Sequence, residues 1–324
     1  MQKATSYKSK QFFALVVKLF VVIGCGYFIY DKIFTNQQQS FLDFTSILME
    51  NDVFSLKNIL LLFVFTFLNW ILEITKWKLL VLQVQNISFF EAAKQSLASL
   101  TASLITPNRI GEYGAKAMFF KKSFSKKILA LNLIGNFSQL VITFIFGILG
   151  CVFLLFKFKI EFDYTNILFV LLFFLLLFLV IRFIDKKEIS FKGYSIKSFK
   201  KFMNDFPKNS IQKIIILSIS RFVIFSHQFY FLLLIFNIEI LYLDAIMCIF
   251  SMYLIASIIP MLSLFDVVLK GSVAILVFSF YQVDKSNILA ITLIMWIFNF
   301  VIPSIVGSYF VLTFSTNKLI RSKE

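Results

Sequence analysis

Two pairs of oppositely charged residues stand inside long apolar stretches of this sequence. Glu112 is followed four residues later by Lys116, and Asp266 is followed four residues later by Lys270. An acid four residues before a base shares one face of a helix with it, and the pair stabilises the helix slightly. Ionisable groups in such apolar segments usually face a partner or a cavity, where they can bind a charged ligand or carry a proton. The alternative is that each acid only caps its helix and each lysine only neutralises the acid.

Each pair follows a proline that interrupts the apolar sequence. Pro107 lies five residues before the first acid, and Pro260 lies six residues before the second. Proline lacks an N–H and disfavours helix in the residue before it, so we expect one helix to end near Thr106 and the next to begin at 108–110. The backbone N–H groups of a helix start favour a phosphate or a carboxylate.

Two further cations belong to the candidate site. Arg109 lies just after the first proline, and Arg221 lies near the centre of another apolar stretch. For Arg221, an ion pair with Asp266 or another acid fits the sequence as well as a substrate contact does. The candidate substrate-binding residues are Arg109, Glu112, Lys116, Arg221, Asp266 and Lys270, and the candidate hairpin breaks are Pro107, Gly111 and Pro260.

The composition identifies the class of protein that carries these residues. Hydrophobic residues make up 59% of the chain and charged residues only 15%, whereas soluble domains carry about 25% charged residues. Crossing a bilayer as a helix takes about 20 apolar residues. Runs of about this length occupy 11–30, 56–72, 128–156, 164–181, 211–236 and 287–314. We therefore expect an all-α polytopic membrane protein with about six full transmembrane helices.

The distribution of charge gives the orientation and excludes a nucleic-acid partner. Segment 182–213 holds nine Lys/Arg against three acids, whereas segment 31–57 holds four acids against two lysines. Basic loops stay on the cytoplasmic side, so the net charge of +15 reflects topology and attraction to anionic lipids. Both termini are predicted to be cytoplasmic in a multi-pass protein.

Two segments do not fit as single crossings. Segments 88–127 and 244–285 each begin and end on the same predicted side, and each of their arms is short for a full span. We expect each to form a re-entrant helical hairpin, with a pair of short full crossings as the alternative.

Together with their flanking spans, the hairpins form two halves of opposite orientation. The first repeat covers about 56–156 and the second about 211–314, linked by a helix at 164–181 and a basic cytoplasmic loop at 182–210. The sequence therefore predicts one integral membrane domain over 1–324 with an inverted repeat. Transporters of this kind bind their substrates near the midplane, between the repeats.

Other polar residues of the apolar segments are expected to serve the structure. Glu73, Lys76 and Trp77 come where a span reaches the inner interface, so we expect an interfacial anchor. Hydrogen bonds between helices are expected of Asn136, Gln139, Trp296 and Asn299. Close helix packing is expected of the small-residue stripe Ser96, Ser99, Ser103 and Thr106.

No pattern in the sequence points to a metal, a cofactor or an enzymatic centre. His227 is the single histidine, and the three cysteines, Cys25, Cys151 and Cys248, are far apart. A phosphate-binding GxxxxGK[ST] loop does not occur. We therefore expect no metal and no cofactor, and transport, if any, to be passive, ion-coupled or driven by a partner.

The sequence PNRIGE at 107–112, with a base four residues later, resembles a Pro-Gly-Arg-x-Gly-Glu motif. That motif belongs to the transmembrane, flippase-like domain of lysylphosphatidylglycerol synthases and its stand-alone relatives, and the resemblance extends over about 12–315. Asn108 replaces the usual glycine, and Lys116 stands where arginine is commoner. The full-length synthases also carry a soluble aminoacyl-transfer domain, to which no segment here corresponds. The resemblance implies lipid translocation or handling rather than aminoacyl-lipid synthesis.

The leading hypothesis is a flippase-like transporter of the bacterial inner (plasma) membrane that binds an anionic phospholipid or lipid-linked headgroup between the two hairpins. An ion-coupled secondary transporter for a small solute is the first alternative. A non-catalytic membrane subunit of envelope lipid biosynthesis is the second. None of the three is an enzyme.

Overall fold

The computed structural model describes most of the two predicted repeats. The described residues are 49, 51–104, 106, 110–159, 190–191, 194–195, 202, 204–259 and 266–314. The predicted spans at 11–30 and 164–181 lie outside them, as do Pro107, Arg109 and Pro260.

Four helical stretches of the described residues are long and apolar enough to cross a membrane. They are α3 (Leu56–Val81), α6 (Ser125–Phe158) with the preceding 3-10 turn η1 (Lys122–Phe124), α9 (Lys208–Ile235), and the run of α12 (Lys285–Trp296), the π-helix η4 (Ile297–Val301) and α13 (Ile302–Leu312). These stretches overlap the spans predicted at 56–72, 128–156, 211–236 and 287–314. The four predictions are confirmed as helices of spanning length and hydropathy.

Both segments between the long helices form pairs of shorter helices. The first pair is α4 (Phe89–Leu104) and α5 (Ile110–Met118), and the second is α10 (Tyr242–Ile258) and α11 (Asp266–Phe278), which is followed by η3 (Ser279–Tyr281). Within each pair the two helices pack against each other. Helix α4 ends at Leu104 and α5 begins at Ile110, and Pro107, to which the break is assigned, lies outside the described residues. Both acids lie in the first turn of the second helix of their pair.

The predicted basic loop contributes one small element to the described residues. Strands β1 (Ser190–Phe191) and β2 (Tyr194–Ser195) pair antiparallel, with Ser190 opposite Ser195.

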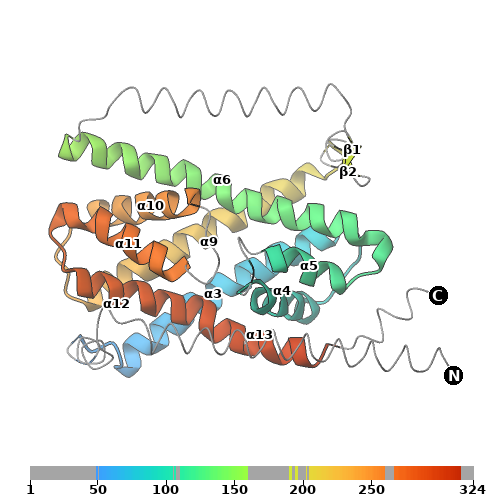
Figure 1. Ribbon diagram of the computed structural model, residues 1–324, viewed down its shortest axis with the longest axis horizontal. Helices are drawn as coiled ribbons and strands as arrows, with labels where there is room; N and C mark the ends of the chain where they lie inside the picture. Colours follow the sequence, from blue (N-terminus) through green and yellow to red (C-terminus); the bar gives the residue numbers. More distant parts are fainter. Residues whose placement is uncertain are drawn as a thin grey trace.

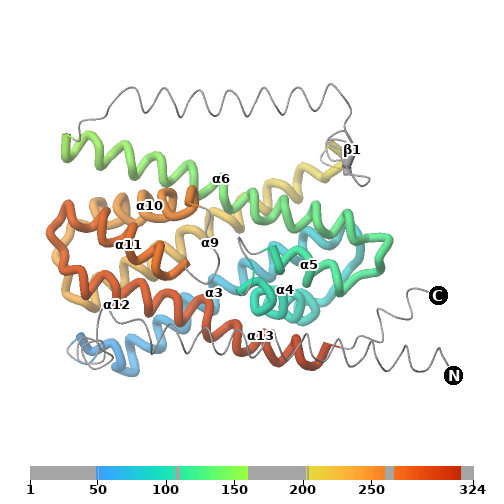
Figure 2. The backbone as a smooth tube through the Cα atoms, viewed as in Figure 1, coloured from blue at the N-terminus to red at the C-terminus, as the bar shows by residue number. Residues whose placement is uncertain are grey.

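The helices are arranged with one hairpin at each end of the molecule (Figure 1). Helices α10 and α11 lie at one end with α12, and α4 and α5 lie at the other with α13. Helices α3 and α9 pack against each other across the middle, and α6 lies against both α9 and α10. Figure 2 shows that α12, η4 and α13 follow one continuous path, which meets α11 first and α4 later. One long helix therefore contacts both hairpins.

The apolar core follows this division into two ends. One cluster joins α9, α10 and α12 through residues such as Phe229, Ile249 and Ile291. A second joins α3, α4 and α6 through residues such as Trp77 and Leu131. Large apolar side chains also face outward, including Leu60, Phe67, Leu149 and Phe156. Such a surface suits the lipid around a membrane-spanning bundle, since lipid tails do not penalise exposed apolar groups.

Small residues bring α4 close to α13, and the ones that show it, Thr101 and Gly307, lie outside the stripe predicted on α4. Ser96, Ser99 and Ser103 are buried, and the Thr101 hydroxyl donates to the Ser304 carbonyl at 2.9 Å. A Cβ placed on Gly307 would collide with the backbone carbonyl of Leu97. Glycine is needed there because the two helix backbones almost touch.

We predict that Gly307→Ala destabilises the protein by about 1–3 kcal/mol, because the added methyl group must push α13 away from α4. Thermal unfolding in detergent, followed by circular dichroism, measures the loss. Gly114→Ala is the matched control, since a Cβ at Gly114 meets nothing within 4 Å. Equal unfolding temperatures for the two variants would contradict the close packing.

Candidate functional site

A cavity of about 470 Å³ is bordered by both helical hairpins and by α3, α6, α9 and η4. Its size is within the range of ligand-binding pockets, roughly 300–1,000 Å³. The charged side chains in its wall are Arg221, Asp266 and Lys270. The structure thus brings together three of the predicted site residues, from helices α9 and α11.

Neutral polar and aromatic side chains form much of the remaining wall. The polar ones are Asn69, Ser103, Tyr113, Asn136, Gln139, Thr143, Ser257 and Asn299, and the aromatic ones include Trp70, Phe222, Phe225, Tyr253 and Phe300. The buried hydroxyl of Tyr253 has no hydrogen-bond partner among the described residues. A wall of this composition suits a ligand that carries charge together with hydrogen-bonding groups.

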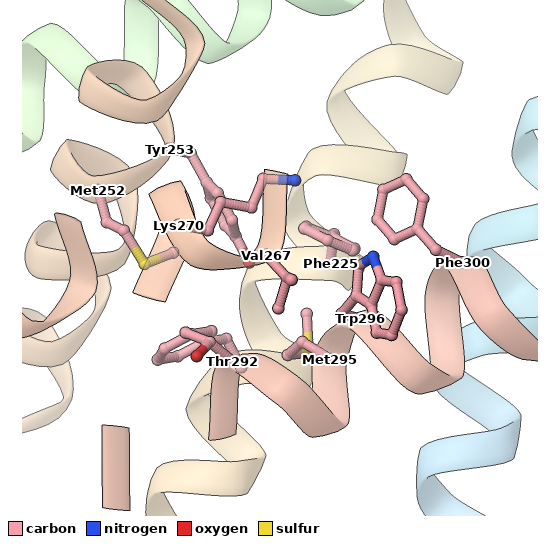
Figure 3. Close-up of a pocket in the computed structure, with 10 residues that line it drawn as sticks. Phe225, Met252, Tyr253, Val267, Lys270, Thr292, Met295, Trp296 and Phe300 are labelled. Atoms are coloured by element: carbon pink, nitrogen blue, oxygen red, sulfur yellow. The ribbon is translucent and has the colours of Figure 1, made fainter. Parts of the chain in front are cut away.

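Lys270 and Asp266 form an ion pair within one turn of α11. The Lys270 ammonium donates to Oδ2 of Asp266 at 2.7 Å, and the two side chains are 26% and 31% exposed. The ammonium also lies 5.1 Å from the centre of the Phe300 ring. Figure 3 shows Lys270 beside Tyr253 with its nitrogen extended toward Phe300, at a second cavity of about 20 Å³. The pair is therefore exposed to the large cavity, and no other helix holds its lysine by a hydrogen bond among the described residues.

Arg221, on α9, is held in place by two side chains of the neighbouring helix α3. Its Nη1 donates to Oε2 of Glu73 at 2.8 Å, and its Nε donates to Oδ1 of Asn69 at 2.9 Å. The same Glu73 oxygen lies 2.8 Å from the Lys76 ammonium. The acid that pairs with Arg221 is therefore Glu73 and not Asp266.

The interfacial anchor predicted for Glu73, Lys76 and Trp77 is wrong. All three side chains are buried, with Lys76 2% and Trp77 1% exposed. The Trp77 indole donates to Oε1 of Gln95 on α4 at 2.7 Å. Helix α3 continues to Val81, which carries these residues past the predicted end of the span and into the packed interior.

Glu112 and Lys116 form a buried ion pair that does not line the cavity. The Lys116 ammonium donates to Oε1 of Glu112 and to Oδ1 of Asn132, each at 2.8 Å, and lies 4.2 Å from the centre of the Trp77 ring. The lysine is 2% and the glutamate 5% exposed. Because Asn132 belongs to α6, this pair joins α5 to α6, and Tyr113 is the residue of α5 that reaches the cavity wall.

A chain of side-chain amides joins the central helices. The Asn69 amide donates to Oδ1 of Asn299, and the Asn299 amide donates to Oε1 of Gln228, each at 2.9 Å. The Gln228 amide in turn donates to the Thr66 hydroxyl at 3.0 Å. Asn299 lies in the π-helix η4, a type of helix found frequently at functional sites.

The hydrogen bonds predicted between helices are present for three residues. Asn299 bonds to α3 and α9, Asn136 donates to the Tyr113 hydroxyl at 3.3 Å, and Gln139 donates to the Ser218 carbonyl at 3.4 Å. Among the described residues there is no group of three or more His, Cys, Asp or Glu side chains that could hold a metal ion.

We predict that Lys116→Met destabilises the protein by about 3–5 kcal/mol, since it leaves the buried Glu112 carboxylate without its lysine. The double variant Glu112→Gln/Lys116→Met should recover much of this loss, because it removes both charges. Denaturant unfolding in detergent measures the differences. Lys157→Met is the comparison, as Lys157 is 38% exposed in its ion pair with Asp244 and should cost less. A double variant as unstable as the single one would contradict the prediction.

Comparison with known families gives one match. The model of the lysylphosphatidylglycerol synthase TM region matches residues 15–307. The comparisons with curated proteins and with solved structures gave no significant match. The matched range contains both hairpins and the whole cavity wall, and it confirms the resemblance seen in the PNRIGE sequence. The chain belongs to the family defined by the transmembrane region of lysylphosphatidylglycerol synthases.

Proposed function

We propose that this protein is a flippase-like membrane protein that binds an anionic lipid headgroup in the large cavity and moves it across the membrane. The observation that carries the proposal is the cavity of about 470 Å³ with Arg221 and Lys270 in its wall. Charged groups inside a membrane protein are costly, and they usually mark a substrate or ion pathway. The family match is to a transmembrane region, which favours a role in moving lipid over a role in synthesising it.

We further propose that the two halves form an inverted repeat with re-entrant hairpins. The order α3, α4, α5, α6 recurs as α9, α10, α11 and the run α12–η4–α13. Helices α4, α5, α10 and α11 have 16, nine, 17 and 13 residues, and a full crossing takes about 20. Both facts support hairpins that enter and leave by the same face, with the cavity between them near the midplane.

In this proposal the site residues have different tasks. Arg221 and Lys270 attract the anionic headgroup, and Asp266 neutralises Lys270 while the site is empty. Glu112 and Lys116 hold α5 against α6, which keeps Tyr113 at the cavity wall. Arg109 remains a proposed headgroup contact on the strength of its place in the sequence motif.

We also propose a place in the cell from the charge pattern of the sequence. The basic segments at 182–213 and near the C-terminus favour a cytoplasmic position for both ends of the chain. With the family match, this arrangement favours the bacterial plasma membrane.

We predict that Arg221→Gln and Lys270→Gln each slow lipid movement at least about tenfold, because each loses a charge-assisted contact worth roughly 1.5–3 kcal/mol. The measurement is the transbilayer movement of acyl-labelled phosphatidylglycerol in proteoliposomes. Lys157→Gln is the matched control, since it removes a lysine of another lysine–aspartate pair that does not line the cavity.

Two outcomes would count against the proposal. Wild-type rates in both cavity variants would contradict the assigned roles of Arg221 and Lys270. Uptake of a small solute driven by a pH gradient, without any lipid movement, would favour the ion-coupled transporter instead.

A further inference from the structure

One carboxylate at the centre of the molecule is shared between two cations. Oε2 of Glu73 lies 2.8 Å from Nη1 of Arg221 and 2.8 Å from Nζ of Lys76. Arg221 is 21% exposed and lines the cavity, whereas Lys76 is 2% exposed. The three side chains, which we call the Glu73 triad, bring two basic groups to one carboxylate.

The two neighbouring ion pairs differ from the triad, in which two basic side chains share one carboxylate. Lys270 has Asp266 as its own carboxylate, and Lys116 has Glu112. In each of these pairs the lysine has one carboxylate to itself. In a site shielded from water an uncompensated charge is costly, and the cost falls when an opposite charge binds beside it. A negatively charged ligand would therefore be stabilised more beside the triad than beside either of the two ion pairs.

The arginine of the triad can meet that ligand in the cavity. A guanidinium carries five N–H donors in a planar fork. The described residues accept hydrogen bonds from Nη1 and Nε of Arg221, and its Nη2 donates to none of them. An arginine at a fixed position suits a phosphate group, to which its Nη2 can donate a charge-assisted hydrogen bond.

We propose that Glu73 is the residue that sets the charge of the accepted headgroup, so that the cavity favours a singly charged phosphodiester over a doubly charged phosphomonoester. The inference rests on the proposed function, because the ligand is the headgroup that enters the same cavity. Glu73 acts through Arg221: it positions the guanidinium at the wall and cancels one of the two positive charges beside it. A phosphodiester then balances the triad, whereas a phosphomonoester leaves one negative charge in excess.

The test measures binding rather than movement. The full-length protein in mixed detergent micelles is equilibrated with equal amounts of phosphatidylglycerol, a phosphodiester, and phosphatidate, a phosphomonoester. At about pH 8 a phosphomonoester carries close to two charges, since its second pKa is about 6. The protein is then repurified, and the ratio of the two bound lipids is determined by mass spectrometry.

The wild-type protein should retain mainly phosphatidylglycerol. Glu73→Gln should shift the ratio about tenfold toward phosphatidate, since it adds one unit of positive charge within a few ångströms of the anion. Glutamine keeps an acceptor for Arg221 and has the same size. The double variant Glu73→Gln/Lys76→Gln should return the ratio toward wild type, because it removes a basic group together with the acid.

Asp244→Asn serves as the control, because Asp244 pairs with Lys157 away from the cavity; its ratio should equal that of the wild type. An unchanged ratio in Glu73→Gln, or a double variant shifted as far as the single one, would overturn the inference. Soluble glycerophosphoglycerol should compete poorly, since it lacks acyl chains. Competition as strong as that of the lipid would show a site for free phosphate esters and would overturn the assignment to lipid headgroups.

The prediction about the ratio of bound lipids and the prediction about lipid movement can be contradicted independently of each other. A protein that shows the expected ratios but moves no lipid would contradict the proposed function and support the role of Glu73. A protein that moves lipid with ratios unaffected by Glu73→Gln would support the proposed function and contradict the role of Glu73.

Discussion

The structure depends on one constraint: a charge placed inside an apolar helical bundle must find its partner within the bundle. Arg221 and Glu73 meet this constraint between α9 and α3, over a sequence separation of 148 residues. The pair is partly buried, with Arg221 21% and Glu73 11% exposed, and the contact fixes how the two central helices face each other. Helix α4 of the first hairpin packs against α3, and α10 of the second packs against α9. Arg221 extends from α9 into the wall of the cavity.

The amide chain extends this fixed centre to the last long helix. Asn299 bonds to Asn69 on α3 and to Gln228 on α9, so η4 is tied to both. The π-helix interrupts α12 and α13 at the point where their contacts change from α11 to α4. Each of the linked side chains, Asn69, Asn299, Gln228 and Thr66, has a partner on another helix. Such a network favours one arrangement of the helices, because an unpaired polar group is costly in a low dielectric.

Local features of the sequence predicted the elements, and long-range contacts decided which residues form the site. The start expected at 108–110 agrees with the start of α5 at Ile110, and the acid–base spacing agrees with the pairing of Lys270 with Asp266. The same spacing could not show that Lys116 faces Asn132 rather than the cavity, because it gives the face of a helix and not its direction in the bundle. Glu73 and Lys76 follow an apolar run, which has the pattern of an interfacial end. The contact with Arg221, 148 residues away in the sequence, is what places Glu73 in the interior of the bundle.

The two cations of the cavity, Arg221 and Lys270, differ in the number of hydrogen bonds that restrain them and in the helix that supplies these bonds. Arg221 is fixed from a second helix by a carboxylate and an amide. Lys270 is held by an acid one turn away on its own helix. Its flexible stem lets the ammonium rotate toward an anion nearby while Asp266 stays within reach. In the proposed function, Arg221 therefore defines where the headgroup sits, and Lys270 adapts to what the headgroup carries.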